Sequence, residues 1–430
     1  MHADPSARDR AGDERAWCLY DWANSAFACT VMAALYPPFF RSIAEADGLA
    51  PADITARWGL VTGLALLVIA LLGPLLGAVA DVTGARKRLL TGFMLLGVAT
   101  TAAFALLPAQ GWPLAALAFA VANIGFAGSI VFYESLLPHV AAPGDLDRVS
   151  ARGYALGYVG GGVLLVVNML WVTMPERFGL GGTGAAVKAS FLSVAAWWLV
   201  FSLPLLRRLR EPAGAVEMTA GRLWRDSFGR LAATWRDIRR YRPLVTLLVA
   251  YWLYNDGIGT IIKMATAYGG ELGIGTGDMI RALVLTQFVA APSTWAAGRL
   301  AGRWGTRPVL LAGLAGYVGI CILGWFMTTP LHFYLLAGLV GTVQGGCQSL
   351  SRSLFGSMVP PGKSAEFFGF YSTSGKFAGI AGPLVFAAVS HVAGEGRLAI
   401  LALVAFFLVG GALLLRVDVE EGRRQARAGR

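Results

Sequence analysis

The chain has 430 residues, of which 56% are hydrophobic and only 14% are charged. Soluble domains carry about 25% charged residues. Much of the surface of a soluble fold of this length is exposed to water, so its core could not bury this many apolar residues. The composition therefore predicts an integral membrane protein. It excludes a disordered chain and a disulfide-rich secreted module.

The predicted elements are membrane-spanning helices, because about 20 apolar residues suffice to cross a bilayer. The polar segment Met1–Arg15 has no apolar core typical of a signal peptide, so the first apolar span is expected to remain as a helix. Two uncharged runs are too long for one crossing and are split by turns that contain proline. The sequence predicts twelve spans: 16–40, 58–80, two within 89–133, 153–175, 189–206, 243–267, 282–298, two within 308–351, 365–390 and 398–415.

An arginine-rich stretch divides these spans into two sets of six. Residues 207–242 contain ten arginines and no apolar run of spanning length. We therefore expect a six-helix bundle over 1–206, a cytoplasmic linker over 207–242, and a second six-helix bundle with a cytoplasmic tail over 243–430.

Basic residues are distributed unequally between the two sides of the predicted bundle. With both termini and the linker inside, the inside segments hold 28 Lys and Arg residues, whereas the outside loops hold six. This bias follows the positive-inside rule and predicts cytoplasmic termini. It also explains the net charge of +11, so no nucleic-acid partner is expected.

A loop motif occurs twice, at the same place in each half. Gly77-x-x-x-Asp81-x-x-Gly84-x-Arg86-Lys87 follows the second span, and Gly298-x-x-x-Gly302-x-x-Gly305-x-Arg307 follows the eighth, 221 residues later. The first copy resembles the loop signature of the major facilitator superfamily. The resemblance implies an all-α membrane fold of two pseudo-symmetric six-helix bundles. Asp81 is expected to accept hydrogen bonds from a neighbouring helix N-terminus as a conformational latch, a role that Gly302 cannot share.

Further segments resemble the vacuole-effluxer-like branch of that superfamily, which is related to an autophagy-associated amino-acid effluxer. They are Leu19-Tyr-Asp-Trp-Ala-Asn-Ser-Ala-Phe27, Leu253-Tyr-Asn-Asp-Gly257, Gln348-Ser-Leu-Ser-Arg-Ser353, Glu366-Phe-Phe-Gly-Phe-Tyr371 and Gly375-Lys376-Phe377. Glu134-Ser135 departs from the branch's pattern. The resemblance implies a transporter, with amino acids as a candidate substrate class.

Polar residues within the spans are the candidates for substrate or ion contact, because buried charge in a membrane is rare and faces a bundle interior or cavity. By resemblance, the first, fourth, seventh and tenth helices line the substrate site between the halves. The candidates are Asp21, Asn24, Ser25, Tyr251, Tyr254, Asn255, Asp256, Gln344, Gln348 and Lys376.

Asp256 and Lys376 are expected to lie at similar depths, about 20 Å and 15 Å from the cytoplasmic face. We predict that they pair, either as a structural ion pair or as part of the transport mechanism. Glu134 and Arg352 are expected near the cytoplasmic span ends. There they would form gate salt bridges or snorkel to the interface.

The predicted function is a secondary transporter that works by alternating access, with amino acids as candidate substrates. Drug/proton antiport and lipid translocation are alternatives within the same fold. A membrane-embedded enzyme or a channel is the alternative from another class, although no HExxH, GxSxG or P-loop motif is present. No metal or cofactor is expected. We expect a monomer in the inner membrane of a bacterium, with protons as a candidate coupling ion.

Overall fold

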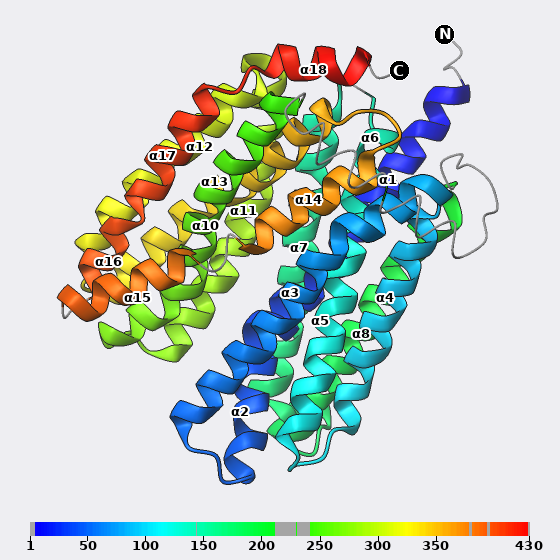
Figure 1. The fold of residues 1–430 in the computed structure, drawn as a ribbon. Helices are drawn as coiled ribbons and strands as arrows, with labels where there is room; N and C mark the ends of the chain where they lie inside the picture. The colour runs from blue at the N-terminus through cyan, green and yellow to red at the C-terminus, as the bar shows by residue number, and fades with distance from the viewer. Residues whose placement is uncertain are drawn as a thin grey trace.

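The structure, a computed structural model, describes residues 5–142, 144–210, 229, 241–377, 381–393 and 396–428. Throughout these ranges the regular elements are helices (Figure 1). We refer to residues 5–210 as the N-terminal half and to residues 241–428 as the C-terminal half. Most of the predicted linker, 211–228 and 230–240, lies outside the described residues.

The N-terminal half begins with one long, nearly continuous helix whose middle section widens into a π-helix. Its elements are α1 (Pro5–Ala26), the π-helix η1 (Phe27–Leu35), α2 (Tyr36–Ala46), α3 (Pro51–Thr83), α4 (Arg86–Ala103), the 3₁₀ turn η2 (Phe104–Leu106), α5 (Trp112–Ser135), α6 (Leu137–Val140), α7 (Leu146–Thr173), the 3₁₀ turn η3 (Pro175–Phe178) and α8 (Thr183–Arg208).

The C-terminal half ends with a short amphipathic helix that lies across the tips of the others (Figure 1). Its elements are α10 (Arg242–Glu271), α11 (Thr276–Trp304), α12 (Thr306–Trp325), α13 (Pro330–Met358), α14 (Ser364–Phe377), α15 (Ala381–Ala393), α16 (Gly396–Ala402), α17 (Val404–Leu415) and α18 (Val419–Ala428).

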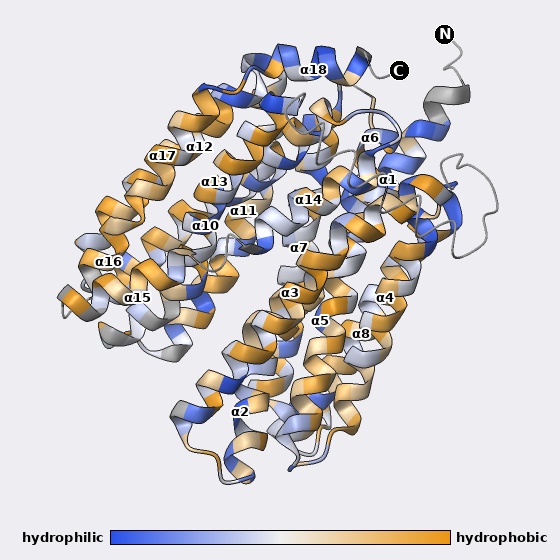
Figure 2. Ribbon diagram, viewed as in Figure 1, coloured by the Kyte–Doolittle hydropathy of each residue, from blue (hydrophilic) through white to orange (hydrophobic). Residues whose placement is uncertain are grey.

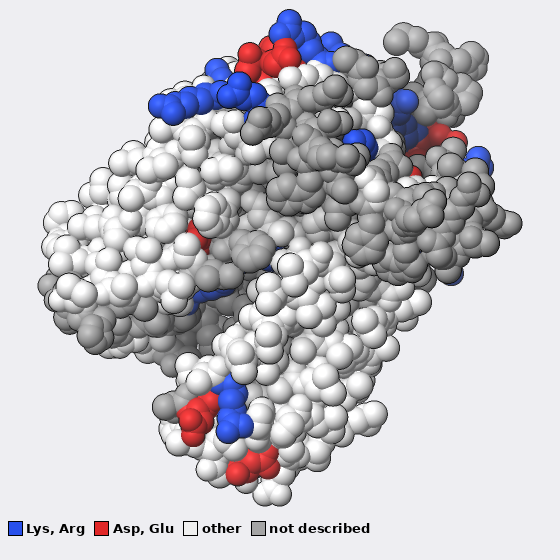
Figure 3. Space-filling model, viewed as in Figure 1, with Lys and Arg blue, Asp and Glu red and all other residues white. Residues whose placement is uncertain are grey.

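Nine helices in the described part of the chain are long and apolar enough to cross a membrane. These nine do not include α11, α13 or the α14–α15 pair, so the count of twelve remains a prediction. Apolar residues cover the flanks of the bundle (Figure 2), and many large ones are exposed, such as Leu60 and Leu331. Charged residues gather at the two ends of the molecule (Figure 3).

Each half has its own main hydrophobic core. One is built from residues between Ala16 and Leu209 with the addition of Ala365, and the other from residues between Leu244 and Val417. Between the cores, the halves meet along two seams: α14 packs against α3 and α5, and α7 packs against α11 and α13.

The chain termini mark one end of the bundle. We call the end that carries α6 and α18 the terminal side, and the end that carries α2 and α16 the open side (Figure 1). The space-filling view shows the molecule hollowed between the halves towards the open side (Figure 3).

Close backbone contact along the α3–α14 seam depends on Gly77. A Cβ atom at this position would overlap the carbonyl oxygen of Ala365, which belongs to α14 and cannot move away as a flexible side chain would. Small residues allow such approaches between helices, so the first glycine of the loop motif has a direct role at the interface of the halves.

We predict that Gly77→Ala lowers the thermal stability of the protein, because the added methyl group forces α3 and α14 apart. Gly63→Ala is the matched control, since Gly63 lies on the same helix and a Cβ added there would meet nothing within 4 Å. The control should be neutral or stabilised by up to about 1 kcal/mol. Thermal unfolding in detergent measures both, and equal melting temperatures for the two variants would contradict the prediction.

Candidate functional site

A cavity of about 480 Å³ lies between the two halves. Its wall towards the open side is apolar and comes mainly from the C-terminal half, whereas most of its polar residues lie deeper, towards the terminal side. The polar and charged lining residues include Asp21, Asn24, Ser25, Glu134, Tyr154, Tyr158, Gln344, Gln348 and Arg352; apolar ones include Ile261, Met264, Leu283, Phe333, Leu336, Val340 and Phe386. The volume is within the range of about 300–1,000 Å³ typical of small-molecule sites.

The π-helix η1 provides small lining residues on the N-terminal side of the cavity. Ala28, Cys29 and Ala33 face it from the wider π turns. Segments of π-helix are rare and occur frequently at functional sites. The widened turns and small side chains leave room in the cavity that longer side chains would fill.

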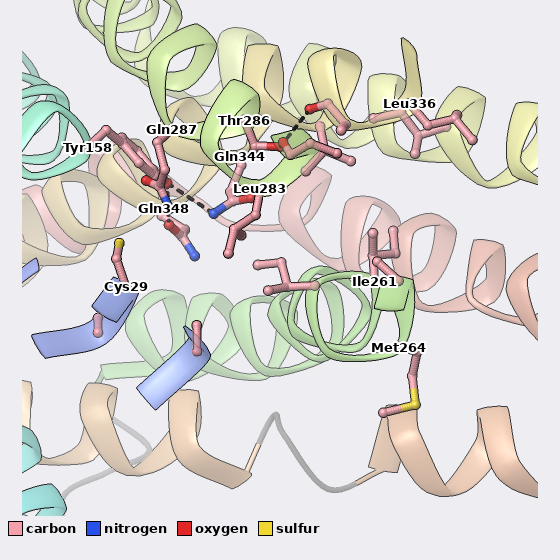
Figure 4. A pocket seen from close by; sticks show the side chains of 18 of the residues that line it. Cys29, Tyr158, Ile261, Met264, Leu283, Thr286, Gln287, Leu336, Gln344 and Gln348 are labelled. Atoms are coloured by element: carbon pink, nitrogen blue, oxygen red, sulfur yellow. Dashed lines mark hydrogen bonds between the residues drawn. The ribbon is translucent and has the colours of Figure 1, made fainter. Parts of the chain in front are cut away.

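A hydrogen-bonded group of three side chains joins the halves within the cavity (Figure 4). The Tyr158 hydroxyl on α7 donates to Gln348 Oε1 at 3.0 Å and accepts from Gln344 Nε2 at 3.2 Å. The two candidate glutamines, four residues apart on α13, therefore face the same way. Tyr158 was not predicted, although its place one turn after Tyr154 on a glycine-rich helix is a usable signal.

Arg352 closes the cavity on its terminal side. Its guanidinium donates to Asp21 Oδ2 at 3.2 Å and to the Ser150 Oγ and carbonyl oxygen at 3.0 Å each. The side chain is only 1% exposed, so it does not snorkel to the interface. An arginine of the C-terminal half is thus held by α1 and α7 of the N-terminal half.

Aromatic rings surround this ion pair and exclude water from it. The Arg352 guanidinium lies 4.8 Å from the centre of the Trp17 ring and 4.3 Å from that of Tyr154. The Tyr133 hydroxyl donates to Asp21 Oδ2 at 2.8 Å, and its ring stacks on Trp17. Cation–π contacts and a second hydrogen bond to the carboxylate compensate the desolvation of the pair.

Glu134 lies beside this gate on the last turn of α5 and is 6% exposed. It interacts electrostatically with Arg352, Lys376 and Asp21. The Lys376 ammonium on α14 donates to Ser372 Oγ at 2.6 Å. Glu134 therefore belongs to the same charged region as Arg352, and both of these gate candidates lie near the ends of their helices. Lys376, like Arg352, approaches Glu134 from the C-terminal half.

The predicted Asp256–Lys376 pair is not formed. Asp256 is buried on α10, where its Oδ2 accepts the Gly382 N–H at 2.9 Å at the start of α15. Its electrostatic partner among the cations is Lys263 on its own helix. The prediction was wrong because depth along a helix does not say which neighbour a side chain faces, and Lys376 faces α5.

Three further candidates of the seventh span also pack within the C-terminal half rather than in the cavity lining. Tyr254 is fully buried and shares a hydrogen bond of 2.6 Å with Ser351 Oγ. Tyr251 stacks on Tyr371 with ring centres 4.3 Å apart. Asn255 is half-buried beside them. None of these residues is among those that line the cavity in this conformation, in contrast to Asp21, Asn24 and Ser25.

Asp81 joins the halves at the terminal side. Its carboxylate accepts the backbone N–H groups of Ala365 and Glu366, at 3.1 Å and 2.9 Å, at the start of α14. Arg86 donates to the same carboxylate at 2.6 Å. The predicted hydrogen bonds to a helix N-terminus are therefore present. Gly84 ends α3 with a φ of 71°, a conformation that favours glycine and turns the chain towards Arg86.

Asp147 supplies an acidic group at the other seam, where the second loop has Gly302. It lies in the first turn of α7, and its carboxylate accepts hydrogen bonds from Thr306 Oγ1, at 2.7 Å, and from Ser353 Oγ. This residue was not predicted. The signal was available, since an acid opposite the loop that lacks one can make an equivalent contact from the other side.

Lys87 completes the first loop by a contact within the N-terminal half. Its ammonium donates to the carbonyl oxygen of Leu209 at 2.7 Å, just after the end of α8. A cation at a helix C-terminus is favourable because the last carbonyl groups have no partner within the helix.

We predict that Asp21→Asn destabilises the protein by about 3–5 kcal/mol, because Arg352 would remain buried without its counter-ion. The double variant Asp21→Asn, Arg352→Gln should recover much of this loss. A double-mutant cycle on the free energy of unfolding measures the coupling, which should be at least about 1 kcal/mol. Additive losses would show that the two side chains contribute independently.

Known proteins match the chain over most of its length. The family described as "Vacuole effluxer Atg22 like" matches residues 52–145 and 143–427. The uncharacterized MFS-type transporter YxiO of Bacillus subtilis (strain 168) is 39% identical over 415 residues, which span 95% of this chain and 95% of YxiO. Autophagy-related protein 22-1 of Penicillium rubens is 25% identical over 463 residues, covering 86% of this chain and 77% of its own.

Solved structures show the same fold at low sequence identity. The human organic anion transporter MFSD10 (TETRAN) has a TM-score of 0.70 and 16% identity, covering 96% of this chain and 100% of that one. The Major Facilitator Superfamily transporter FucP, in its outward conformation, has a TM-score of 0.69 and 14% identity over 95% of this chain and 98% of its own. These relatives are transporters and not enzymes. The chain therefore belongs to the Atg22-like vacuole effluxer family of major facilitator superfamily transporters, and it is an integral membrane protein.

Proposed function

We propose that the chain moves an amphipathic small solute across the membrane by alternating access, with the cavity between the halves as its binding site. The observation that carries this proposal is the one-sided closure of that cavity. Asp21 and Arg352 seal it on the terminal side, while its apolar wall extends towards the open side. In alternating access, this gate would open when the other side of the cavity closes.

The chemistry of the lining supports an amino acid with an apolar side chain as the first substrate to test. The deeper part of the cavity offers the Asp21 carboxylate, the Arg352 guanidinium and the polar side chains of Asn24 and Ser25, which suit the ammonium and carboxylate groups of a zwitterion. The wall formed by residues such as Leu283, Phe333 and Val340 suits an apolar side chain.

A drug-like amphipathic cation is the second candidate, since the wall is largely apolar and the volume exceeds what one amino acid needs. The Asp21 carboxylate lies at the charged end of the cavity, where it would attract the positive charge of such a cation. Such a substrate would imply antiport rather than uptake.

The positive-inside bias supports placing the terminal side in the cytoplasm, with Arg207–Arg242 as the cytoplasmic linker between two six-helix domains. The structure would then correspond to an outward-open state in a cytoplasmic membrane. Reporter fusions that place the linker outside would contradict this orientation.

Exchange by the purified protein in liposomes tests the proposed function. We expect radiolabelled L-leucine outside to exchange with unlabelled L-leucine inside, and L-isoleucine or L-tyrosine to compete better than glycine or L-glutamate. Exchange of radiolabelled tetraphenylphosphonium without exchange of L-leucine would favour the drug-like candidate instead. Liposomes without protein are the control, and absence of exchange with every compound would contradict the proposal.

We predict that Asp81→Asn slows leucine exchange by about tenfold or more while leaving leucine affinity nearly unchanged. The variant loses charge-assisted hydrogen bonds between α3 and α14, far from the cavity. Asp47→Asn is the matched control, because Asp47 also accepts two helix-start N–H groups, of Gly111 and Trp112, but within one half. A loss of affinity that matches the loss of rate would argue against a latch.

A further inference from the structure

Glu134 differs from Asp21 and Asp81, two other buried carboxylates that lie between the halves. Asp21 and Asp81 each accept several hydrogen bonds from described residues. Glu134 is equally well buried, but among the described residues no hydrogen bond or salt bridge reaches its carboxylate. A buried, ionised carboxylate without hydrogen bonds is unfavourable, and binding one proton removes its charge.

The groups that face Glu134 come from five helices. Asp21 approaches from α1 and Tyr154 from α7. Tyr251 approaches from α10, Arg352 from α13, and Tyr371 with Lys376 from α14. Both cations therefore belong to the C-terminal half, while Glu134 belongs to the N-terminal half. When it is ionised, Glu134 attracts the two halves to each other at the gate; when it is protonated, that attraction is lost.

The cavity gives Glu134 access to water on one side at a time. It lines the cavity that extends towards the open side, and the Asp21–Arg352 contact separates it from the terminal side. Opening of that contact would expose the same carboxylate to the opposite solution. A single group would thus meet both solutions alternately, which is the requirement for carrying a proton across.

We propose that Glu134 is the proton-binding residue that couples transport to a pH gradient. This inference rests on the proposed transport function and adds its driving ion. A proton from water on the open side binds a carboxylate oxygen of Glu134, and it leaves to water on the terminal side after the gate has opened. When Glu134 is protonated, its electrostatic attraction to Arg352 and Lys376 is lost. No other bond is formed or broken.

Transport by Glu134→Gln in liposomes separates coupling from solute movement. With L-leucine as the probe, the wild type should exchange at equal pH and should also accumulate leucine under a pH gradient of one sign, by up to about tenfold per pH unit for one proton. Glu134→Gln should exchange but not accumulate, and Glu134→Asp should restore accumulation. Gradient-driven accumulation by Glu134→Gln, or loss of its exchange as well, would overturn the proposal; the second result would assign Glu134 to the substrate.

The matched control is Glu14→Gln, which makes the same chemical change at a residue that is also 6% exposed but lies off the cavity and pairs with Arg148. It should accumulate leucine like the wild type. If the wild type exchanges leucine without any response to pH, coupling fails while the transport function stands. If the wild type exchanges no compound, the transport function itself fails.

An infrared titration of the purified protein needs no substrate. We expect a protonated-carboxyl band that titrates in the wild type and in Glu14→Gln and is missing from Glu134→Gln. Identical titrations in all three proteins would overturn the proposal even if Glu134→Gln were too unstable for transport assays.

Discussion

The desolvated guanidinium of Arg352 is the constraint on which the gate depends. A buried charge in a membrane protein must be paired and hydrogen-bonded, and the partners of Arg352 lie on the other half of the molecule. The need to neutralise one side chain therefore holds α13 against α1 and α7. It seals the cavity on the terminal side, and in the proposed transport function it leaves the open side as the route for solute.

The two seams solve the same problem by different chemistry. At the α3–α14 seam the acid, Asp81, comes from the N-terminal loop and accepts backbone N–H groups. At the α7–α13 seam the acid, Asp147, comes from α7 and accepts hydrogen bonds from the hydroxyl groups of Ser353 and Thr306. Both acids thus belong to the N-terminal half, and both bind groups of the C-terminal half. Hydrogen bonds of this kind can break in a conformational change more readily than a hydrophobic core can, so the halves can separate as units.

The sequence predicted those features that depend on local pattern. Apolar runs predicted the helices, and the spacing of Gly77, Asp81 and Gly84 predicted a close approach and an acceptor for a helix N-terminus. The depth of Arg352 predicted a place near the span end. Its partner, Asp21, is 331 residues away in the chain, and no periodicity in the sequence specifies such a pairing.

The features that the sequence did not predict depend on the rotation of each helix about its axis and on which helices pack beside it. Asp256 and Lys376 have similar depths, but Asp256 caps α15 and Lys376 turns towards Glu134 on α5. Asp147 was not predicted because the second loop has Gly302 in place of an acid, and the structure supplies the acid from the helix that packs against this loop. The sequence motif identifies the loop, but only the folded structure shows which helix the loop contacts.

Pulsed electron paramagnetic resonance distances across both ends of the molecule test most directly whether the Asp21–Arg352 contact keeps the terminal side closed. One pair of spin labels would be attached at Ser42 on α2 and Val392 on α15, to measure the distance between the halves at the open side. A second pair, at the exposed residues Arg88 on α4 and Arg424 on α18, would measure it at the terminal side. In Asp21→Asn, Arg352→Gln, the account predicts a new population with a shorter distance for the first pair and a longer distance for the second. Distance distributions that match the wild type at both ends would contradict it.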